Sequence, residues 1–103
     1  MNSKIFGLLG FASKAGKLAY GMANTLEAIK KGKSLLVIAA GDISPNSNKE
    51  ISFFCNKYNV KLISLSENME AMSSAIGRRC GIISVNNKGF ADAISEQYGK
   101  ADI

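Results

Sequence analysis

Reactive side chains are scarce in this sequence. Histidine is absent, and the two cysteines, Cys55 and Cys80, stand far apart and outside any metal-binding motif, so neither a zinc site nor a disulfide framework is expected. Cys80 follows Arg78 and Arg79, and adjacent positive charge can activate a thiol by lowering its pKa. No carboxylates are paired in a recognisable catalytic motif. We therefore predict that the protein is not an enzyme, needs no cofactor or metal, and uses both cysteines as core residues.

Positive charge is a stronger indication of function than the reactive side chains are. The chain carries 13 Lys and Arg against 8 Asp and Glu, which gives a net charge of +5. A compact domain with this excess presents a positive field to polyanions such as nucleic acids. Basic proteins that bind no nucleic acid have the same balance, so charge by itself leaves both interpretations open.

Length and hydropathy limit the organisation of the chain. Its 103 residues suit a single domain, which we expect to cover residues 1–103. The apolar runs are far shorter than the ~20 residues that cross a bilayer. Gly7, Gly10 and Ser13 also interrupt the apolar segment that a signal peptide would need. We expect a cytoplasmic protein with no membrane partner.

The elements that would position a binding site centre on one apolar run. Residues 34–40 read Ser-Leu-Leu-Val-Ile-Ala-Ala and break into Gly41-Asp42-Ile43-Ser44-Pro45. An uninterrupted apolar run is typical of a strand that is covered by helices on both faces of its sheet. Ligands of such sheets bind beyond the carboxyl ends of the strands, so residues 41–48 are the first place to expect function.

Helix and strand patterns alternate along the rest of the chain. We predict helices between 3 and 16, over 21–31, from a capping box at 47–50 to 59, from a cap at 66 to 77, and after 86–87. We predict further strands over 18–20, 60–65 and 82–85. Gly21 as N-cap would leave the amides of Met22, Ala23 and Asn24 free to meet an anion. Helical spacing places Phe54 and Tyr58 in the core rather than on a base-stacking surface. Short connections force the strands into one sheet with helices on both faces, a three-layer α/β/α sandwich.

Several segments together resemble a known family. They are 8–18 (Leu-Leu-Gly-Phe-Ala-Ser-Lys-Ala-Gly-Lys-Leu), 21–32, 33–39 with 42–46, 55–60, 75–77 and 89–91. In these segments the chain resembles the kink-turn RNA-binding ribosomal proteins of the L-seven-Ae and L-thirty-e type, in particular their bacterial YlxQ-like branch. The resemblance implies a mixed four-stranded sheet in the α/β/α sandwich. It also implies an RNA site made from the helix after Gly21, the loop after the central strand and the segment entering the helix near Met69.

The resemblance implies roles for particular residues. It assigns Gly21, Asn24, Thr25, Lys30 and Lys31 to the recognition helix, Asp42 to the loop, and Met69 and Met72 to an apolar cover for an extruded base. Beside these, the free amide of Met22 and the charges of Lys17 and Arg78 are expected to contact phosphates. Ala23 stands where the family's kink-turn binders carry Lys or Asn, and Glu27 stands where they carry Lys. Ser73 replaces a glycine of the family pattern.

Two functions follow from these residues. The first is a non-enzymatic, ribosome-associated protein that recognises structured, kink-turn-like RNA, with ribosomal RNA as the expected partner. The alternative is a protein-interaction module of the same fold that has lost kink-turn recognition and binds ribosomal or other proteins, with Met69 and Met72 as an adaptable apolar contact. A third interpretation of the two methionines is simple core packing.

Overall fold

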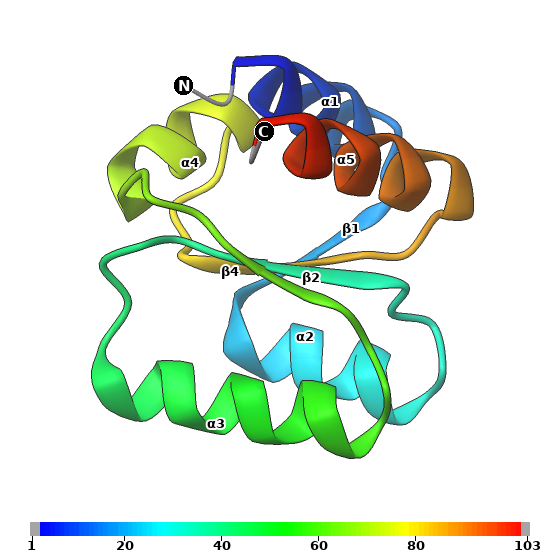
Figure 1. The fold of residues 1–103 in the computed structure, drawn as a ribbon, viewed down its shortest axis with the longest axis vertical. Helices are drawn as coiled ribbons and strands as arrows, with labels where there is room; N and C mark the ends of the chain where they lie inside the picture. Colours follow the sequence, from blue (N-terminus) through cyan, green and yellow to red (C-terminus); the bar gives the residue numbers. More distant parts are fainter. Residues whose placement is uncertain (1–2, 102–103) are drawn as a thin grey trace.

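A four-stranded mixed sheet lies between two layers of helices in the computed structural model, which describes residues 3–101 (Figure 1). Helices α1, α4 and α5 cover one face of the sheet, and α2 and α3 cover the other. The elements are α1 (Ser3–Lys14), β1 (Leu18–Tyr20), α2 (Gly21–Lys30), β2 (Leu36–Ala39), α3 (Pro45–Lys57), β3 (Leu62–Ser64), α4 (Met69–Ile76), β4 (Ile82–Val85) and α5 (Lys88–Ala101). The predicted α/β/α sandwich is confirmed.

The strand order is β1-β4-β2-β3. Strand β4 pairs antiparallel with both β1 and β2, whereas β2 and β3 are parallel. The carboxyl ends of β1, β2 and β3 therefore meet at the same edge of the sheet. All residues of β2 and β4 are buried, which explains why the central strand reads as an uninterrupted apolar run.

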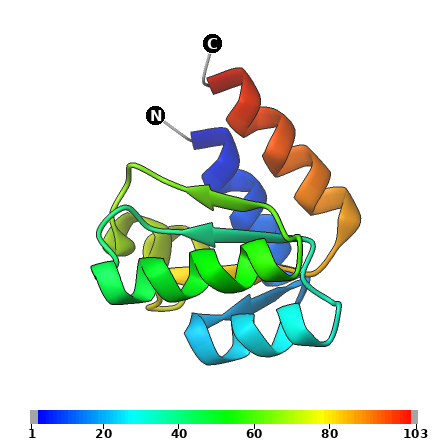
Figure 2. The same ribbon diagram turned by 60° about the horizontal axis from the view of Figure 1, so that its bottom comes forward.

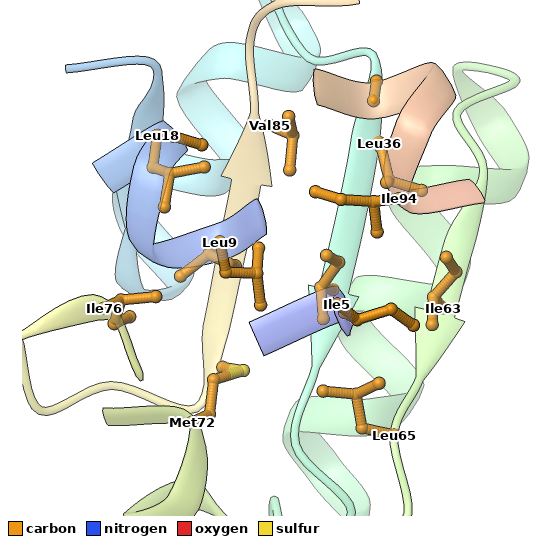
Figure 3. Close-up of a cluster of buried hydrophobic side chains, with 14 of the residues drawn as sticks. Ile5, Leu9, Leu18, Leu36, Ile63, Leu65, Met72, Ile76, Val85 and Ile94 are labelled. Carbon is orange, nitrogen blue, oxygen red and sulfur yellow. The ribbon is translucent and has the colours of Figure 1, made fainter. Parts of the chain in front are cut away.

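Two apolar clusters fill the spaces between the layers. Leu36 and Ile38 of β2 face the cluster under α1, α4 and α5, where they meet side chains such as Ile5 and Ile94 (Figure 3). Val37 and Ala39 belong to the opposite cluster, beneath α2 and α3. This alternation follows from the two-residue period of a strand. A sheet buried on both faces fixes the positions of its strand ends, where the loops of the site begin.

Local side-chain caps decide where three helices begin. The Ser44 hydroxyl accepts a hydrogen bond from the Ser47 amide at 3.1 Å, and Pro45 occupies the first turn of α3. The predicted capping box at 47–50 is therefore wrong, because Ser44 caps the helix three residues earlier. Helix α4 is capped by Asn68, whose Oδ1 accepts from the Ala71 amide at 2.9 Å, and not by the predicted residue 66.

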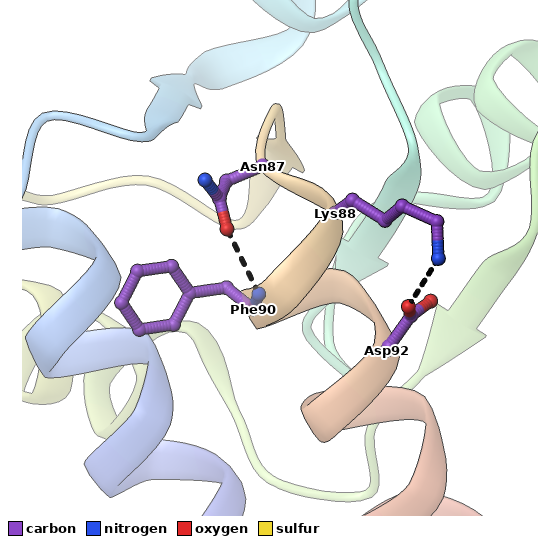
Figure 4. A network of polar contacts seen from close by, with 4 residues as sticks. All are labelled: Asn87, Lys88, Phe90 and Asp92. Atoms are coloured by element: carbon purple, nitrogen blue, oxygen red, sulfur yellow. Dashed lines mark hydrogen bonds and ion pairs between the residues drawn. The ribbon is translucent and has the colours of Figure 1, made fainter.

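Helix α5 starts at the predicted turn. Asn87 Oδ1 accepts a hydrogen bond from the Phe90 amide at 3.0 Å, and the Lys88 ammonium lies 2.7 Å from an Asp92 carboxylate oxygen one turn later (Figure 4). Figure 2 shows α5 lying beside α1. Within residues 3–101, no helix is both long and apolar enough to cross a membrane.

The aromatic residues of α3 are less buried than predicted. Ile51 and Cys55 are buried against the sheet, Phe54 is partly buried, and Tyr58 is 39% exposed. The assignment of Tyr58 to the core is therefore wrong. Tyr58 follows the last residue of the helix, and its ring stacks on Phe54 rather than entering the apolar cluster.

Candidate functional site

The N-terminal ends of three helices meet around one pocket at the carboxyl edge of β1, β2 and β3. Its volume is about 280 Å³. The lining residues come from the starts of α2, α3 and α4 and from the segment entering β4: Gly21, Met22, Asp42, Ile43, Ser44, Ser47, Met69, Cys80, Gly81 and Ile82. Helix N-termini carry partial positive charge and free amide donors. Ser44 caps α3, and Asp42 and Asn68 accept from the first amides of α4, so the uncapped start of α2 is the part of the rim that favours an anionic ligand.

Helix α2 opens onto the pocket without a side-chain cap. Gly21 has a φ of +86°, which other residues rarely adopt. Tyr20 flanks the helix in an extended conformation and makes no capping hydrogen bond, so the helix includes Gly21 rather than following it as predicted. The Asn24 side chain donates to the Tyr20 carbonyl at 3.0 Å. The Gly21 amide faces the Cys80 sulfur, so the amides of Met22 and Ala23 are the ones left to water or to a ligand.

The loop after β2 is tied to the start of α4. A Cβ atom on Gly41 would lie 2.6 Å from the Leu65 carbonyl oxygen, so only glycine fits there. The next residue, Asp42, accepts a hydrogen bond from the Met69 amide through Oδ1 at 2.7 Å. A carboxylate at a helix N-terminus is favourable because it opposes the helix dipole. Asp42 therefore holds two walls of the pocket together.

The floor of the pocket is apolar. Met22, Ile43 and Met69 are partly buried, and flexible thioether side chains can adapt to the shape of a ligand. Gly81 keeps this floor open, because a Cβ atom there would lie 2.9 Å from Ile43 Cγ2 and 3.6 Å from Met69 Cε. An apolar floor beneath an anion-favouring rim suits a flat ring that carries a phosphate.

A second hollow of about 330 Å³ runs beside the exposed side of α2, where Asn24, Glu27, Lys31 and Lys33 are among its lining residues. Lys31 Nζ lies 2.6 Å from Glu27 Oε1. The hydrogen bond from Lys31 and its positive charge lower the pKa of Glu27, so the carboxylate is ionised near neutral pH. Glu27 therefore offsets the charge of the lysine that could otherwise attract a polyanion.

Arg78 lies at the start of α2 through its contact with Tyr20. Its guanidinium carbon is 4.5 Å from the centre of the Tyr20 ring, a cation–π distance. The Tyr20 hydroxyl bonds to the Ser13 hydroxyl at 2.6 Å, and Ser13 in turn donates to the Ile76 carbonyl at 2.8 Å. This chain of contacts joins α1, β1 and the end of α4, and holds a permanent positive charge over the Tyr20 ring.

Cys80 is not an activated thiol. Burial raises its pKa, and the amides of Gly21 and Ile82 and the charge of Arg78 offset this only in part. Ser73, which the family resemblance marks as unusual, hydrogen-bonds both backbone groups of Cys80, at 3.2 Å to the nitrogen and 3.4 Å to the oxygen. The Cys80 segment is thus a packed wall of the pocket rather than a reactive one.

The structure separates the predicted site residues into groups. Gly21, Met22, Asp42 and Met69 line the pocket, and Asn24 and Lys31 line the hollow beside α2. Arg78 lines another hollow, at the end of α4, with Arg79 and Glu70. Lys30 lies elsewhere, 5.1 Å from the Phe54 ring, and Lys17 is exposed but lines neither the pocket nor the hollow beside α2.

Two predicted site residues are buried, and their assignment to a surface is corrected. Met72 is 0% exposed within the apolar core, as the core-packing interpretation of the methionines expects. Thr25 is also 0% exposed, because it lies on the same face of α2 as Ala28 and Ile29, toward the sheet.

Ile43, Ser44 and Ser47 lie within residues 41–48, where function was expected, although none was given a role in binding, and Gly81 was missed. Gly81 carried a usable signal, because a glycine directly before a buried strand often marks a close approach of another segment. The two serines were assigned only to starting α3. Among the described residues, no group of three or more His, Cys, Asp and Glu is placed to hold a metal ion.

Comparison with known proteins gives a consistent result. A sequence model of the family described as "Ribosomal protein L7Ae/L30e/S12e/Gadd45 family" matches residues 3–95. The RNA-binding protein YlxQ of Enterococcus faecium is 30% identical over 93 residues, which cover 90% of this chain and 89% of that protein. YlxQ of Bacillus subtilis is 29% identical over 90 residues, 86% of this chain and 89% of that protein. A solved structure of a protein with unknown function from Bacillus halodurans is 26% identical, covers 94% of this chain and 98% of its own, and superposes with a TM-score of 0.90.

Proposed function

This chain belongs to the ribosomal protein L7Ae/L30e/S12e/Gadd45 family, and on that basis we propose that it is a non-enzymatic RNA-binding protein. Its pocket at the helix N-termini recognises structured, kink-turn-like RNA. The names of its relatives, RNA-binding protein YlxQ in two bacterial species, support the general activity. The specific RNA geometry and an association with ribosomal RNA are our own extension.

The uncapped start of α2 above an apolar floor is the observation that carries this proposal. Proteins read RNA where its helix is distorted, through unstacked bases and the phosphates beside them. The rim amides of α2 would meet a phosphate, and Met22, Ile43 and Met69 would cover an extruded base. Arg78, which contacts Tyr20 just before α2, and Lys31, at the far end of that helix, would contact phosphates further along the RNA.

The alternative, a protein-interaction module, has less support. It relied on Met69 and Met72 as a shared apolar contact, and Met72 is fully buried. Met69 by itself is only partly exposed and lies at a pocket whose rim favours an anion.

Binding to two matched RNAs tests the proposal. One is a duplex with a kink-turn, and the other is the same duplex with its sheared G·A pairs replaced by Watson–Crick pairs. We expect clear preference for the kink-turn RNA. If three or four phosphates are contacted, affinity should fall roughly 40- to 150-fold between about 50 mM and about 200 mM salt.

Equal affinity for the two RNAs would contradict kink-turn recognition while leaving general RNA binding in place. A dissociation constant that does not change with salt would contradict phosphate contact altogether. Ribosome association has its own measurement, which is co-sedimentation with ribosomal particles in low and high salt. A protein that stays in the soluble fraction at low salt would contradict it.

A further inference from the structure

A strip of aromatic rings and lysines lies along the outer side of α3. We call it the aromatic strip and define it as Lys30, Phe53, Phe54, Lys57 and Tyr58. Phe53 is 60% exposed and Tyr58 is 39% exposed. The Phe53 and Phe54 rings meet edge to face with centroids 5.3 Å apart, and those of Phe54 and Tyr58 lie nearly parallel at 6.4 Å. Three adjoining rings therefore form one continuous surface.

Two lysines border these rings. Lys30 Nζ is 5.1 Å from the centre of the Phe54 ring, and Lys57 Nζ is 5.7 Å from that of Tyr58. Among residues 3–101, the lysines that form ion pairs are Lys31, Lys88 and Lys100, so neither Lys30 nor Lys57 takes part in one. No cation lies over the Phe53 ring in this part of the chain. Within the strip, Phe53 thus offers uncovered ring surface beside unpaired positive charge.

Packing of the fold explains Phe54, which lies against the apolar cluster beneath α2 and α3, but it does not explain Phe53. Helix α3 meets the sheet through Ile51 and Cys55, which are buried, while Phe53 points away from that contact. Isolated exposed apolar residues are common, but a contiguous group of large apolar side chains marks an interaction surface.

We propose that the aromatic strip binds an unpaired segment of RNA. A base stacks on the uncovered Phe53 ring, and Lys30 and Lys57 contact the phosphates on either side. Aromatic platforms among basic residues are how proteins hold single strands without reading sequence, since every base has a stackable face. A protein partner fits less well, because lysine is depleted at the centres of protein interfaces.

The strip is separate from the pocket, so this proposal does not depend on the proposed function. In Figure 1, α2 and α3 both run from left to right, which puts their N-terminal ends on one side and their C-terminal ends on the other. Ser47 lines the pocket and Tyr58 ends the strip. At 1.5 Å per helical residue, Ser47 is roughly 9 Å from Phe53 and roughly 16 Å from Tyr58 along α3.

Binding of a labelled oligouridylate of about twelve nucleotides tests the proposal, because this probe has no stable fold of its own. Phe53→Ala should weaken binding roughly 5- to 100-fold, the effect of losing one base stack. Phe53→Tyr keeps the ring and should bind as the wild type does. Phe11→Ala is the matched control, since Phe11 is 67% exposed on α1 and lies outside the strip.

A fluorescence measurement separates stacking from indirect effects. The chain contains no tryptophan, so Phe53→Trp places a single indole in the strip. Its emission should be quenched by oligouridylate, and that of Phe11→Trp should not. Equal loss of affinity in Phe53→Ala and Phe11→Ala, or an unquenched Phe53→Trp, would overturn the proposal. So would a dimer in sedimentation that Phe53→Ala dissociates, because the strip would then be a protein contact.

Discussion

Glu27 is a carboxylate on the exposed side of α2, where the hollow beside that helix is otherwise basic. It holds Lys31 in an exposed ion pair at 2.6 Å on the side of α2 that lines the basic hollow. Exposed pairs of this kind contribute little to stability, because water and salt screen the attraction. Their effect on a polyanion is larger, since the carboxylate both repels phosphate and neutralises its lysine partner.

We predict that Glu27→Gln tightens binding to kink-turn RNA several-fold and that Glu27→Lys tightens it further, with the salt slope rising by about one unit for each additional phosphate that the protein binds. Fluorescence anisotropy at several salt concentrations measures both quantities. Asp92→Asn is the matched control, because it breaks an equivalent pair with Lys88 on α5 and changes the net charge by the same amount (Figure 4). If Asp92→Asn tightens binding equally, the effect comes from net charge rather than from α2.

The buried thiol of Cys55 makes the stability of the folded protein depend on pH. Its side chain is 3% exposed, and burial raises its pKa to about 11 from 9.0. The folded protein therefore holds the thiol proton more tightly than the unfolded chain does. This stabilisation is fully present below about pH 9 and is lost as pH rises toward 11.

We predict that between about pH 8 and about pH 11 the free energy of unfolding of the wild type falls by about 2 kcal/mol more than that of Cys55→Ala. Urea unfolding of both proteins at the two pH values measures this difference. Lysine and tyrosine ionisation affects both proteins alike and cancels in the comparison. Parallel losses would mean that the Cys55 thiol titrates normally in the folded state.

At the scale of single elements, the start of α2 combines two features, a backbone that needs glycine and a first turn without a side-chain cap. Its backbone needs glycine at position 21 because φ is +86°, and its first turn is uncapped. Gly32, at the other end of the same helix, has a φ of +74° and equally open surroundings, but it lines neither the pocket nor the hollow beside α2. Comparing substitutions at Gly21 and Gly32 therefore separates the effect of backbone strain from the effect of blocking a ligand.

We predict that Gly21→Ala and Gly32→Ala lower stability alike, by about 1–2 kcal/mol, because a Cβ is unfavourable in the left-handed region. Only Gly21→Ala should weaken RNA binding, by about tenfold, since its methyl group stands where a phosphate would approach the free amides. Thermal unfolding and RNA titration of the two variants provide the measurements. If affinity falls equally in both, Gly21 has a structural role alone.

At the scale of the whole molecule, the sheet topology places the two candidate surfaces. The carboxyl ends of β1, β2 and β3 share one edge, so the helices that follow them begin around the pocket. The aromatic strip lies at the opposite ends of α2 and α3. One RNA with a kink and an unpaired extension could therefore reach both surfaces.

We predict that adding an unpaired uridine tail to a kink-turn RNA tightens binding by at least about tenfold, because the second contact becomes intramolecular. Phe53→Ala should abolish this improvement and leave affinity for the untailed RNA unchanged. Gly21→Ala and Phe53→Ala should act additively on the tailed RNA, since distant sites couple weakly. A tail that adds nothing at any length would show that one RNA does not span the two surfaces.

The sequence by itself determined the elements whose signals are local. The limits of β1 and β4 agree with the structure, and the continuous apolar run marks β2 as the central strand, because periodicity and glycine punctuation act over a few residues. The family resemblance supplied the mixed four-stranded sheet, which is confirmed. Local signals did not determine the cap positions, because the neighbouring polar residues Ser44 and Ser47 can each start a helix.

Only the tertiary structure decided which side chains face outward. Thr25 and Asn24 are neighbours in sequence, yet Thr25 is buried under the sheet and Asn24 lines a hollow. Phe53 is exposed while Ile51 is buried, because the sheet covers just one side of α3. The pocket itself combines four segments far apart in the chain. Local patterns record the period of an element, but exposure depends on which other element covers each face, and that is set by the packing of the whole chain.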